Sequence, residues 1–197
     1  MSHCDDGRAT HGLIGRTTIV ARVSILLDAR RSVLLFGPPG IGKSAIVAAV
    51  SRPGLVVADP FERVTRQASA RLRRVIEASG IVLAAGRSAR AADLGAVRRL
   101  LWRMESVRVE PLTDRDIRTL LHAALTLGGV PHTAVPKSWL SDAVKVVEGL
   151  PGRAVAVAHA AAMRWRADCG LLPPRLALVV SWQDGLAGAD HAPSQAP

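Results

Sequence analysis

Residues 37–44 combine glycine, lysine and serine at a spacing that can bind phosphate. They are, in order, Gly37, Pro38, Pro39, Gly40, Ile41, Gly42, Lys43 and Ser44. Glycines let backbone N–H groups turn toward a phosphate, and a following helix adds the partial positive charge of its N-terminus. We expect Lys43 to reach the β- and γ-phosphates and the Ser44 hydroxyl to hold Mg²⁺. The segment therefore predicts a nucleoside triphosphate site rather than a chance Gly/Pro turn.

Short strands and helices alternate around this segment. Apolar runs of β type cover residues 32–36, 55–58, 81–85 and 107–109, and helices are expected from about residue 17 and over 43–51, 61–79 and 94–104. This alternation predicts an α/β fold of three layers with a short parallel sheet. After Pro111 the pattern changes to helices only, over about 113–127, 138–148 and 153–167, which predicts a small all-helical lid.

The same pattern divides the chain into parts. We expect a flexible N-terminus over 1–12, a nucleotide-binding core over 13–111, a helical lid with a C-terminal segment over 112–184, and a disordered tail over 185–197. Residues 171–182 are apolar but contain Pro173 and Pro174, so the pattern does not decide between strand and helix there.

Residues 37–44 form the expected phosphate loop. Its interior, Pro-Pro-Gly-Ile-Gly, resembles the corresponding loop of the AAA+ ATPases. Residues 13–16, Leu-Ile-Gly-Arg, are similar to the family element that contacts the adenine edge, which implies that Gly15 and Arg16 bind nucleotide. Residues 149–153 resemble the sensor-2 region of initiator-type and transposition-helper ATPases and also the "GLP" of STAND ATPases. That likeness implies a contact between Arg153 and the γ-phosphate. The resemblance covers about residues 13–168 and implies that ATP and Mg²⁺ are the ligands.

The family pattern also implies an acidic residue that ends a hydrophobic strand and completes the metal shell beside Ser44. Asp59 follows the apolar run 55–58 and supplies that acid, so Lys43 and Asp59 are the candidate catalytic residues. The next residue, Pro60, cannot polarise water, and the reach of Glu62 stays open. A second interpretation makes Asp59 the N-cap of the helix expected from about residue 60, and both roles are compatible.

Two alignments with the family pattern are possible because Asp59 follows Lys43 so closely. In the first, one strand–helix unit of the family is missing and Asp59 is the metal-shell acid. In the second, residues 55–58 form the ordinary second strand, and the strand over 81–85 should carry the acid. That strand ends at Gly86 and Arg87 without one, so we favour the first alignment and expect slow or conditional hydrolysis.

Positive charge is concentrated in one part of the chain. The whole protein carries 26 Lys and Arg against 16 Asp and Glu, and the region Arg63–Arg108 has eleven arginines against three acidic residues. An arginine-rich helix face there could follow the phosphates of duplex DNA. A solvated surface in an arginine-rich protein explains the charge equally well. Candidate sensors or intersubunit fingers within this region are Arg87, Arg98, Arg99 and Arg103.

Composition argues against several other classes of protein. Two cysteines and six scattered histidines give neither a disulfide framework nor a zinc pattern. No apolar run approaches the roughly 20 residues that span a bilayer, and Asp5 and Asp6 argue against a signal peptide. We therefore expect a cytoplasmic protein with no membrane partner.

These features together predict an AAA+-like ATP-binding module that works as a nucleotide-dependent switch. One hypothesis is a DNA-associated helper ATPase that assembles into a homo-oligomer. The alternative is a STAND-like regulatory ATPase that acts on a protein partner without binding DNA.

Overall fold

The computed structural model describes residues 13–78, 80–168 and 170–172. The predictions for the N-terminus 1–12, the apolar residues 173–182 and the tail 185–197 lie outside the described residues. The elements follow in the order α1 (Thr17–Asp28), β1 (Ser32–Phe36), α2 (Lys43–Val50), β2 (Leu55–Ala58), η1 (Phe61–Arg63), α3 (Arg66–Glu77), β3 (Ile81–Gly86), η2 (Ala91–Arg103), β4 (Met104–Arg108), α4 (Asp114–Leu127), η3 (His132–Ala134), α5 (Lys137–Val147) and α6 (Pro151–Ala167), where η marks a 3₁₀ helix.

The described strands form one parallel sheet in the order β2-β3-β1-β4. The central strand β1 pairs with β3 on one side, where Val33 faces Leu83, and with β4 on the other, where Ser32 faces Met104. Because all pairs are parallel, the carboxyl ends of the strands lie along one edge, where open α/β sheets bind their ligands. The phosphate loop leaves the sheet at this edge, after β1.

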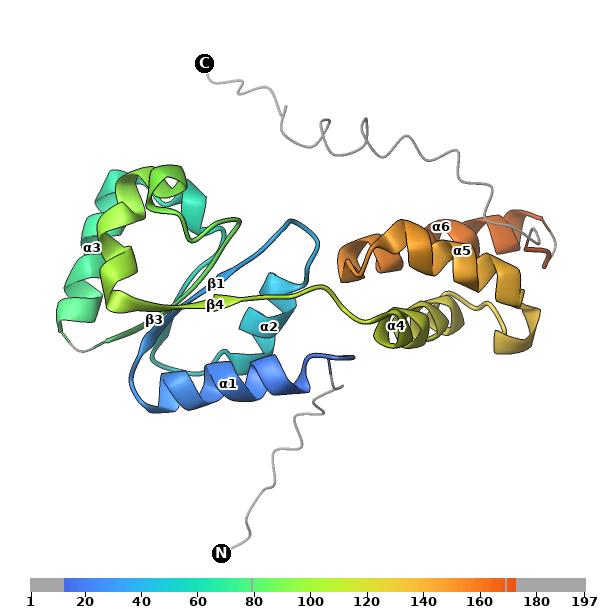
Figure 1. Ribbon diagram of the computed structural model, residues 1–197, viewed down its shortest axis with the longest axis horizontal. Helices are drawn as coiled ribbons and strands as arrows, with labels where there is room; N and C mark the ends of the chain where they lie inside the picture. Colours follow the sequence, from blue (N-terminus) through green and yellow to red (C-terminus); the bar gives the residue numbers. More distant parts are fainter. Residues whose placement is uncertain (1–12, 79, 169, 173–197) are drawn as a thin grey trace, which may run out of the picture.

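Side chains that alternate along the strands build a separate apolar layer on each face of the sheet. Leu35 of β1 packs with residues of α1 and α2, whereas Leu34 packs on the opposite face with Phe61 and Leu72. Both layers are formed by fully or nearly fully buried side chains. The predicted three-layer α/β core with a short parallel sheet is therefore confirmed (Figure 1).

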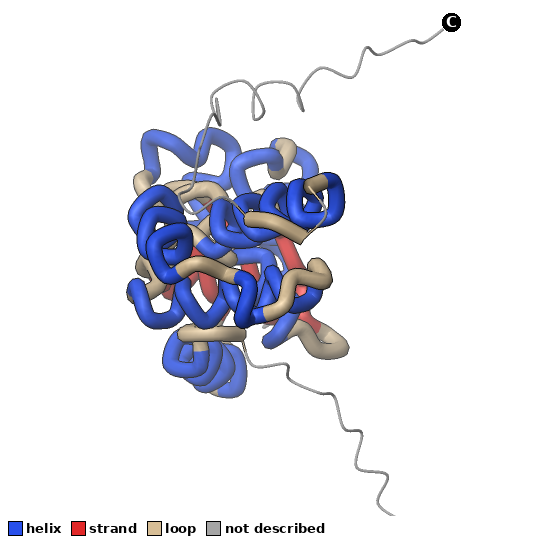
Figure 2. The backbone as a smooth tube through the Cα atoms, turned by 90° about the vertical axis from the view of Figure 1, so that its right-hand side faces the viewer, coloured by secondary structure: helices blue, strands red, loops and turns tan. Residues whose placement is uncertain are grey.

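The three long helices after β4 form a lid with a core of its own. Its cluster includes Ile117 and Leu121 of α4, Trp139 of α5 and Ala158 of α6, all buried. Figure 1 shows the lid beside the α/β core, joined to it by the segment between β4 and α4, and Figure 2 shows the strands behind the lid helices. The lid and the core thus have separate hydrophobic clusters and meet beside the phosphate loop.

Two predicted elements differ from the structure in their bounds. The helix expected over 61–79 is divided into η1 and α3, because the Thr65 hydroxyl accepts a hydrogen bond from the Ala68 N–H at 3.2 Å and begins a new helix. The helix expected over 94–104 is the 3₁₀ segment η2. The last strand begins at Met104 rather than at residue 107, because Met104 already pairs with Ser32.

Candidate nucleotide-binding site

The phosphate loop connects β1 to α2, as the sequence predicts. Gly40 and Gly42 have φ angles of +75° and +95°, which are values that favour glycine over any residue with a side chain. Gly42 is also the N-cap of α2, so the helix begins at Lys43. The first N–H groups of α2 have no partner within the helix, which gives this end of the loop a positive potential.

Lys43 extends back over the loop from the first turn of α2. Its Nζ donates to the carbonyl oxygens of Gly37 at 2.9 Å and Pro38 at 3.0 Å. Burial lowers the pKa of Lys43; the carboxylates of Glu62 and then Asp59 oppose this shift, and Arg87 adds to it. The ammonium therefore contacts two loop carbonyls and is influenced by two nearby carboxylates, at the place where a phosphate would meet it.

Asp59 lies directly after β2, and its carboxylate faces the phosphate loop. The Ser44 hydroxyl donates to Asp59 Oδ2 at 2.7 Å. The segment that follows Asp59 is capped by Pro60 without a side-chain hydrogen bond, and Thr65 caps α3. Asp59 is therefore not the cap of η1 or of α3, and its carboxylate lies beside Ser44, while its role as the metal-shell acid stays a prediction.

This hydroxyl and carboxylate suit a hard cation. Mg²⁺ prefers oxygen ligands and is usually held by one or two protein groups together with substrate phosphates. Within the part of the chain that the structure describes, no group of three or more His, Cys, Asp or Glu side chains is clustered to hold a metal alone. Ser44 and Asp59 therefore fit Mg²⁺ carried by a nucleotide.

Glu62 is a carboxylate whose reach the sequence leaves open. Its Oε1 accepts a hydrogen bond from the backbone N–H of Arg87, just beyond the end of β3. The neighbouring Gly86 leaves room for it, because a Cβ there would lie 2.9 Å from the same oxygen. Glu62 therefore belongs to the polar groups at the carboxyl edge of the sheet, together with Lys43 and Asp59.

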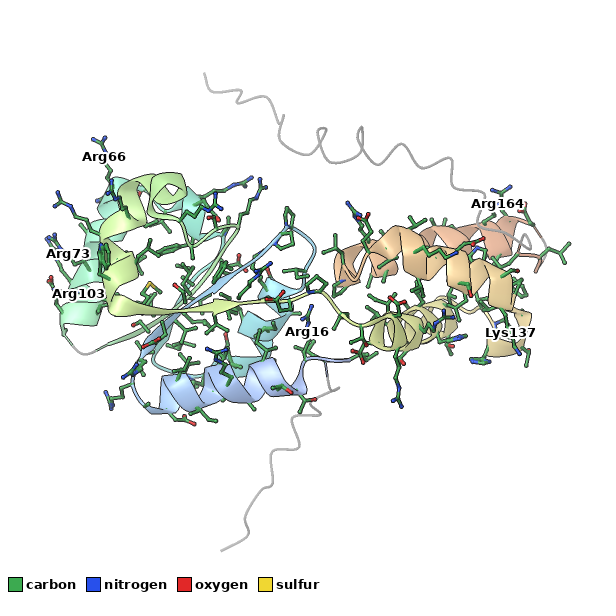
Figure 3. All side chains as sticks on the ribbon, in the orientation of Figure 1. Arg16, Arg66, Arg73, Arg103, Lys137 and Arg164 are labelled. Atoms are coloured by element: carbon green, nitrogen blue, oxygen red, sulfur yellow. The ribbon has the colours of Figure 1, made fainter. Side chains whose placement is uncertain are left out.

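Arg16 connects the segment before α1 to the loop and to the start of the lid. The side chain is only 7% exposed, and it donates to the carbonyl of Ile41 at 2.8 Å and to that of Glu110 at 2.5 Å. Burial lowers the pKa of Arg16, and the nearby Asp116 carboxylate opposes that shift. Gly15 has a φ of +67°, and a Cβ on it would lie 2.6 Å from that carboxylate. The geometry gives Arg16 a positioning role on the loop backbone (Figure 3).

A small apolar cavity adjoins the loop where core and lid meet. Its volume is about 70 Å³, and its lining includes Leu13 and Ile14 from before α1, Ala45 of α2, and Leu112 and Pro151 from the lid side. An aromatic base would meet mainly hydrophobic surface here. Leu13 and Ile14 therefore lie beside the loop, and the adenine contact that the family resemblance implies for residues 13–16 stays a prediction.

The first turn of α6 lies directly on the phosphate loop. The Gly152 N–H donates to the Gly40 carbonyl at 2.8 Å, and a Cβ at residue 152 would lie 2.9 Å from Gly40 Cα. The sequence analysis singles out this region for Arg153, but in the structure Arg153 is paired with Glu148. The contact through Gly152 has no sequence signal beyond the glycine itself, because it joins residues that are far apart in the chain.

The remaining candidate arginines lie away from the loop or at its margin. Arg87 is exposed at the end of β3, close enough to Lys43 to act on it electrostatically. Arg98 and Arg99 are exposed on η2, and Arg103 is paired with Glu77 at 3.5 Å. The structure thus brings Arg87 to the site and places Arg103 in an ion pair on the core.

The fold and this site together define a P-loop NTPase core followed by a helical lid. No protein-family model matches the sequence, and no curated protein matches it either. Among solved structures, the chain is similar to RuvB, the Holliday junction branch migration motor of Thermotoga maritima, with a TM-score of 0.59 and 15% identity over 82% of this chain and 66% of that one.

Two mutant forms of Thermotoga maritima RuvB give TM-scores of 0.61 at 16% and 17% identity. They match over 82% and 83% of this chain and over 67% and 66% of their own chains. This chain therefore has the fold of an AAA+ P-loop ATPase, as its loop resemblance predicts, and spans about two thirds of the length of those proteins. Among the described residues, no helix is long and apolar enough to cross a membrane.

Proposed function

We propose that the chain is an ATP-binding AAA+ module that works as a nucleotide-dependent switch, with slow or conditional hydrolysis of ATP to ADP and phosphate. The observation that carries this proposal is the hydrogen bond between Ser44 and Asp59 beside the Lys43 ammonium. Lys43 would meet the β- and γ-phosphates, and Ser44 and Asp59 would hold the Mg²⁺ that neutralises phosphate charge.

The lid supplies the second half of the proposed switch. It reaches the phosphate loop through the bond from Gly152 to Gly40, and it borders the apolar cavity proposed for the base. A nucleotide that occupies both places would contact core and lid together. Binding would then shift the lid toward whichever orientation makes more contacts with the nucleotide.

The test of nucleotide binding is a titration with a fluorescent ATP analogue in the presence of Mg²⁺. We expect saturable binding that Lys43→Ala weakens by at least tenfold, while Lys137→Ala, an exposed lysine of the lid, leaves it unchanged. Equal affinity of the Lys43 variant and the unmodified protein would contradict the proposal. Sedimentation with and without ATP would test the homo-oligomer that the proposal allows.

We further propose that duplex DNA is the partner of the arginine-rich side of the core. Arg66 and Arg73 of α3 and Arg103 of η2 lie along the edge of the core that is farthest from the lid (Figure 3). Glu77 is paired with Arg73 at 3.7 Å and with Arg103 at 3.5 Å, but all three side chains are about half exposed. Exposed pairs of this kind are weak, so these arginines can exchange Glu77 for phosphates.

A matched pair of triple variants tests the DNA proposal. The first changes exposed arginines of α3 to glutamine, Arg66, Arg71 and Arg74; the second makes the same change in charge on the lid, at Arg115, Arg118 and Lys137. In fluorescence anisotropy with a labelled duplex, we expect the first to reduce the slope of log K against log salt by about 2 to 3, since each phosphate contact contributes about 0.9. The lid variant should keep the slope.

Equal slopes for the two triple variants would contradict the DNA proposal. The second candidate, a STAND-like regulatory ATPase with a protein partner, would then be preferred. One observation favours that candidate: the lid exposes the apolar side chains Leu127, Val155 and Met163, which are 89%, 50% and 53% exposed. Exposed apolar side chains that lie together are typical of surfaces that bind other proteins.

A further inference from the structure

The carboxylate of Glu62 is held in a fixed place beside the phosphate loop. Its Oε1 accepts the N–H of Arg87, and the absence of a side chain at Gly86 leaves the space that it occupies. Phe61, the residue before it, is completely buried and anchors η1 against the sheet. The orientation of Glu62 is therefore set by a backbone donor and by the packing of its own segment.

The two carboxylates near Lys43 have different partners. Asp59 accepts the Ser44 hydroxyl, on the side where a cation would be held, whereas Glu62 accepts a backbone N–H at the end of the neighbouring strand. The end of that strand lies beside the phosphate loop, because Gly86 pairs with Phe36, the residue before Gly37. Glu62 thus lies at the end of the strand next to the phosphate loop, while Asp59 is engaged with Ser44.

Hydrolysis of ATP needs a group that orients a water molecule and takes its proton, and the residue after Asp59 is a proline. We propose that Glu62 is that group. This inference rests on the proposed function, because it assigns a role in a reaction at the same site. It makes the segment after β2, rather than the strand itself, the source of the reactive carboxylate.

The proposed hydrolysis requires only ATP, one water molecule and the side chains described above. The oxygen of water forms a bond to the γ-phosphorus, and the bond from that phosphorus to the bridging oxygen breaks, with its electron pair leaving on ADP. One proton of the water passes to the Glu62 carboxylate and is then released to solvent, so the products are ADP, inorganic phosphate and one proton. The Lys43 ammonium faces the charge that develops on the phosphoryl oxygens.

The test compares Glu62→Gln with Glu77→Gln in the full chain. Glutamine keeps an oxygen that can accept the Arg87 N–H, so only the basic charge is lost at residue 62; Glu77 is a glutamate on the surface of α3, away from the loop. We expect Glu62→Gln to bind the fluorescent ATP analogue within threefold of the unmodified protein and to lose about 100-fold or more of its turnover, as for loss of a general base. Glu77→Gln should match the unmodified protein in both.

A second readout does not depend on the rate. After incubation with labelled ATP and Mg²⁺, the Glu62→Gln protein should retain intact ATP, whereas the unmodified protein should retain ADP. Gly86→Ala provides an independent variant. The new Cβ would lie 2.9 Å from Glu62 Oε1, which is too close, so the carboxylate would have to move. This variant should lower turnover while it preserves binding.

The outcomes separate this inference from the proposed function. Turnover by Glu62→Gln within threefold of the unmodified protein would overturn the role of Glu62. The role of Glu62 would also be overturned if the unmodified protein hydrolysed ATP no faster than Lys43→Ala. In that case ATP could still bind, and the proposed switch would stand. Absence of ATP binding by the unmodified protein would instead remove the proposed function itself.

Discussion

Replacing Gly152 with alanine tests whether the lid is held on the phosphate loop. Gly152 is in the first turn of α6, and its N–H, which has no partner within the helix, donates to the Gly40 carbonyl at 2.8 Å. An alanine Cβ would lie 2.9 Å from Gly40 Cα and 3.1 Å from Gly40 O. Both are backbone atoms of the loop, so they cannot turn aside as a flexible side chain would.

Whether Gly152→Ala raises or lowers the free energy of unfolding depends on this contact between Gly152 and Gly40. In a helix without neighbours, alanine is more stable than glycine by roughly 0.5–1 kcal/mol. Against that gain, a forced overlap in a packed region costs typically about 1–3 kcal/mol, and the hydrogen bond to Gly40 is worth about 0.5–1.5 kcal/mol when it is lost. The middle of these ranges gives a net loss of about 2 kcal/mol, which lowers Tm by about 4–8 °C in a chain of this size.

Thermal unfolding and hydrogen exchange measure this loss. We expect a lower Tm and faster exchange of the amides in the first turn of α6, and weaker binding of the ATP analogue, because the lid borders the cavity proposed for the base. Val155→Ala, at a half-exposed position one turn further along α6, is the control and should leave all three unchanged. A Tm for Gly152→Ala equal to or above that of the unmodified protein would refute the reasoning.

Three further substitutions have defined outcomes. Asp59→Asn keeps the shape beside Ser44 but removes the charge, so Mg²⁺ should strengthen ATP binding several-fold less than in the unmodified protein, measured with and without EDTA. Arg16 donates to the carbonyls of Ile41 and Glu110, and a lysine would leave one of them without its buried donor. Arg16→Lys should therefore lower the free energy of unfolding by about 1–3 kcal/mol in urea titrations. Burial and the stacked ring of His132, 4.1 Å away, lower the pKa of His122, so stability is greatest above the ordinary pKa of 6.5 and falls on acidification. His122→Phe should flatten the fall in Tm between about pH 6.5 and 5.

The sequence predicts the parts of this molecule that depend on local pattern. The strand, glycine-rich loop and helix over residues 32–50 follow from apolar runs and from the positive φ angles that only glycine adopts readily. The helix that begins after Thr113 follows from a capping residue, whose hydroxyl accepts the Asp116 N–H at 3.2 Å. Each of these signals is contained within a few neighbouring residues, so the sequence alone is enough to locate it.

The sequence does not predict contacts that depend on how distant segments come together. Whether Glu62 reaches the loop depends on the path of η1 over the end of β3, and nothing near residue 62 records that path. The resemblance of Arg16 to an adenine-contacting residue gives no indication of its bonds to Ile41 and Glu110. The bounds of β4 depend likewise on its pairing with β1, which begins at Met104.

These long-range contacts indicate how the proposed nucleotide switch would couple the phosphate loop to the lid. Two consecutive carbonyls of the phosphate loop are each bonded to a segment outside it: Gly40 to Gly152 of the lid, and Ile41 to Arg16. Arg16 also donates to Glu110, on the connection that leads from β4 to the lid. A rotation of the loop backbone on phosphate binding would have to lengthen or re-form these bonds. Because the lid is bonded to the loop directly and through Arg16, a change at the phosphates would move both ends of its attachment together, which is what a switch that couples nucleotide to lid orientation requires.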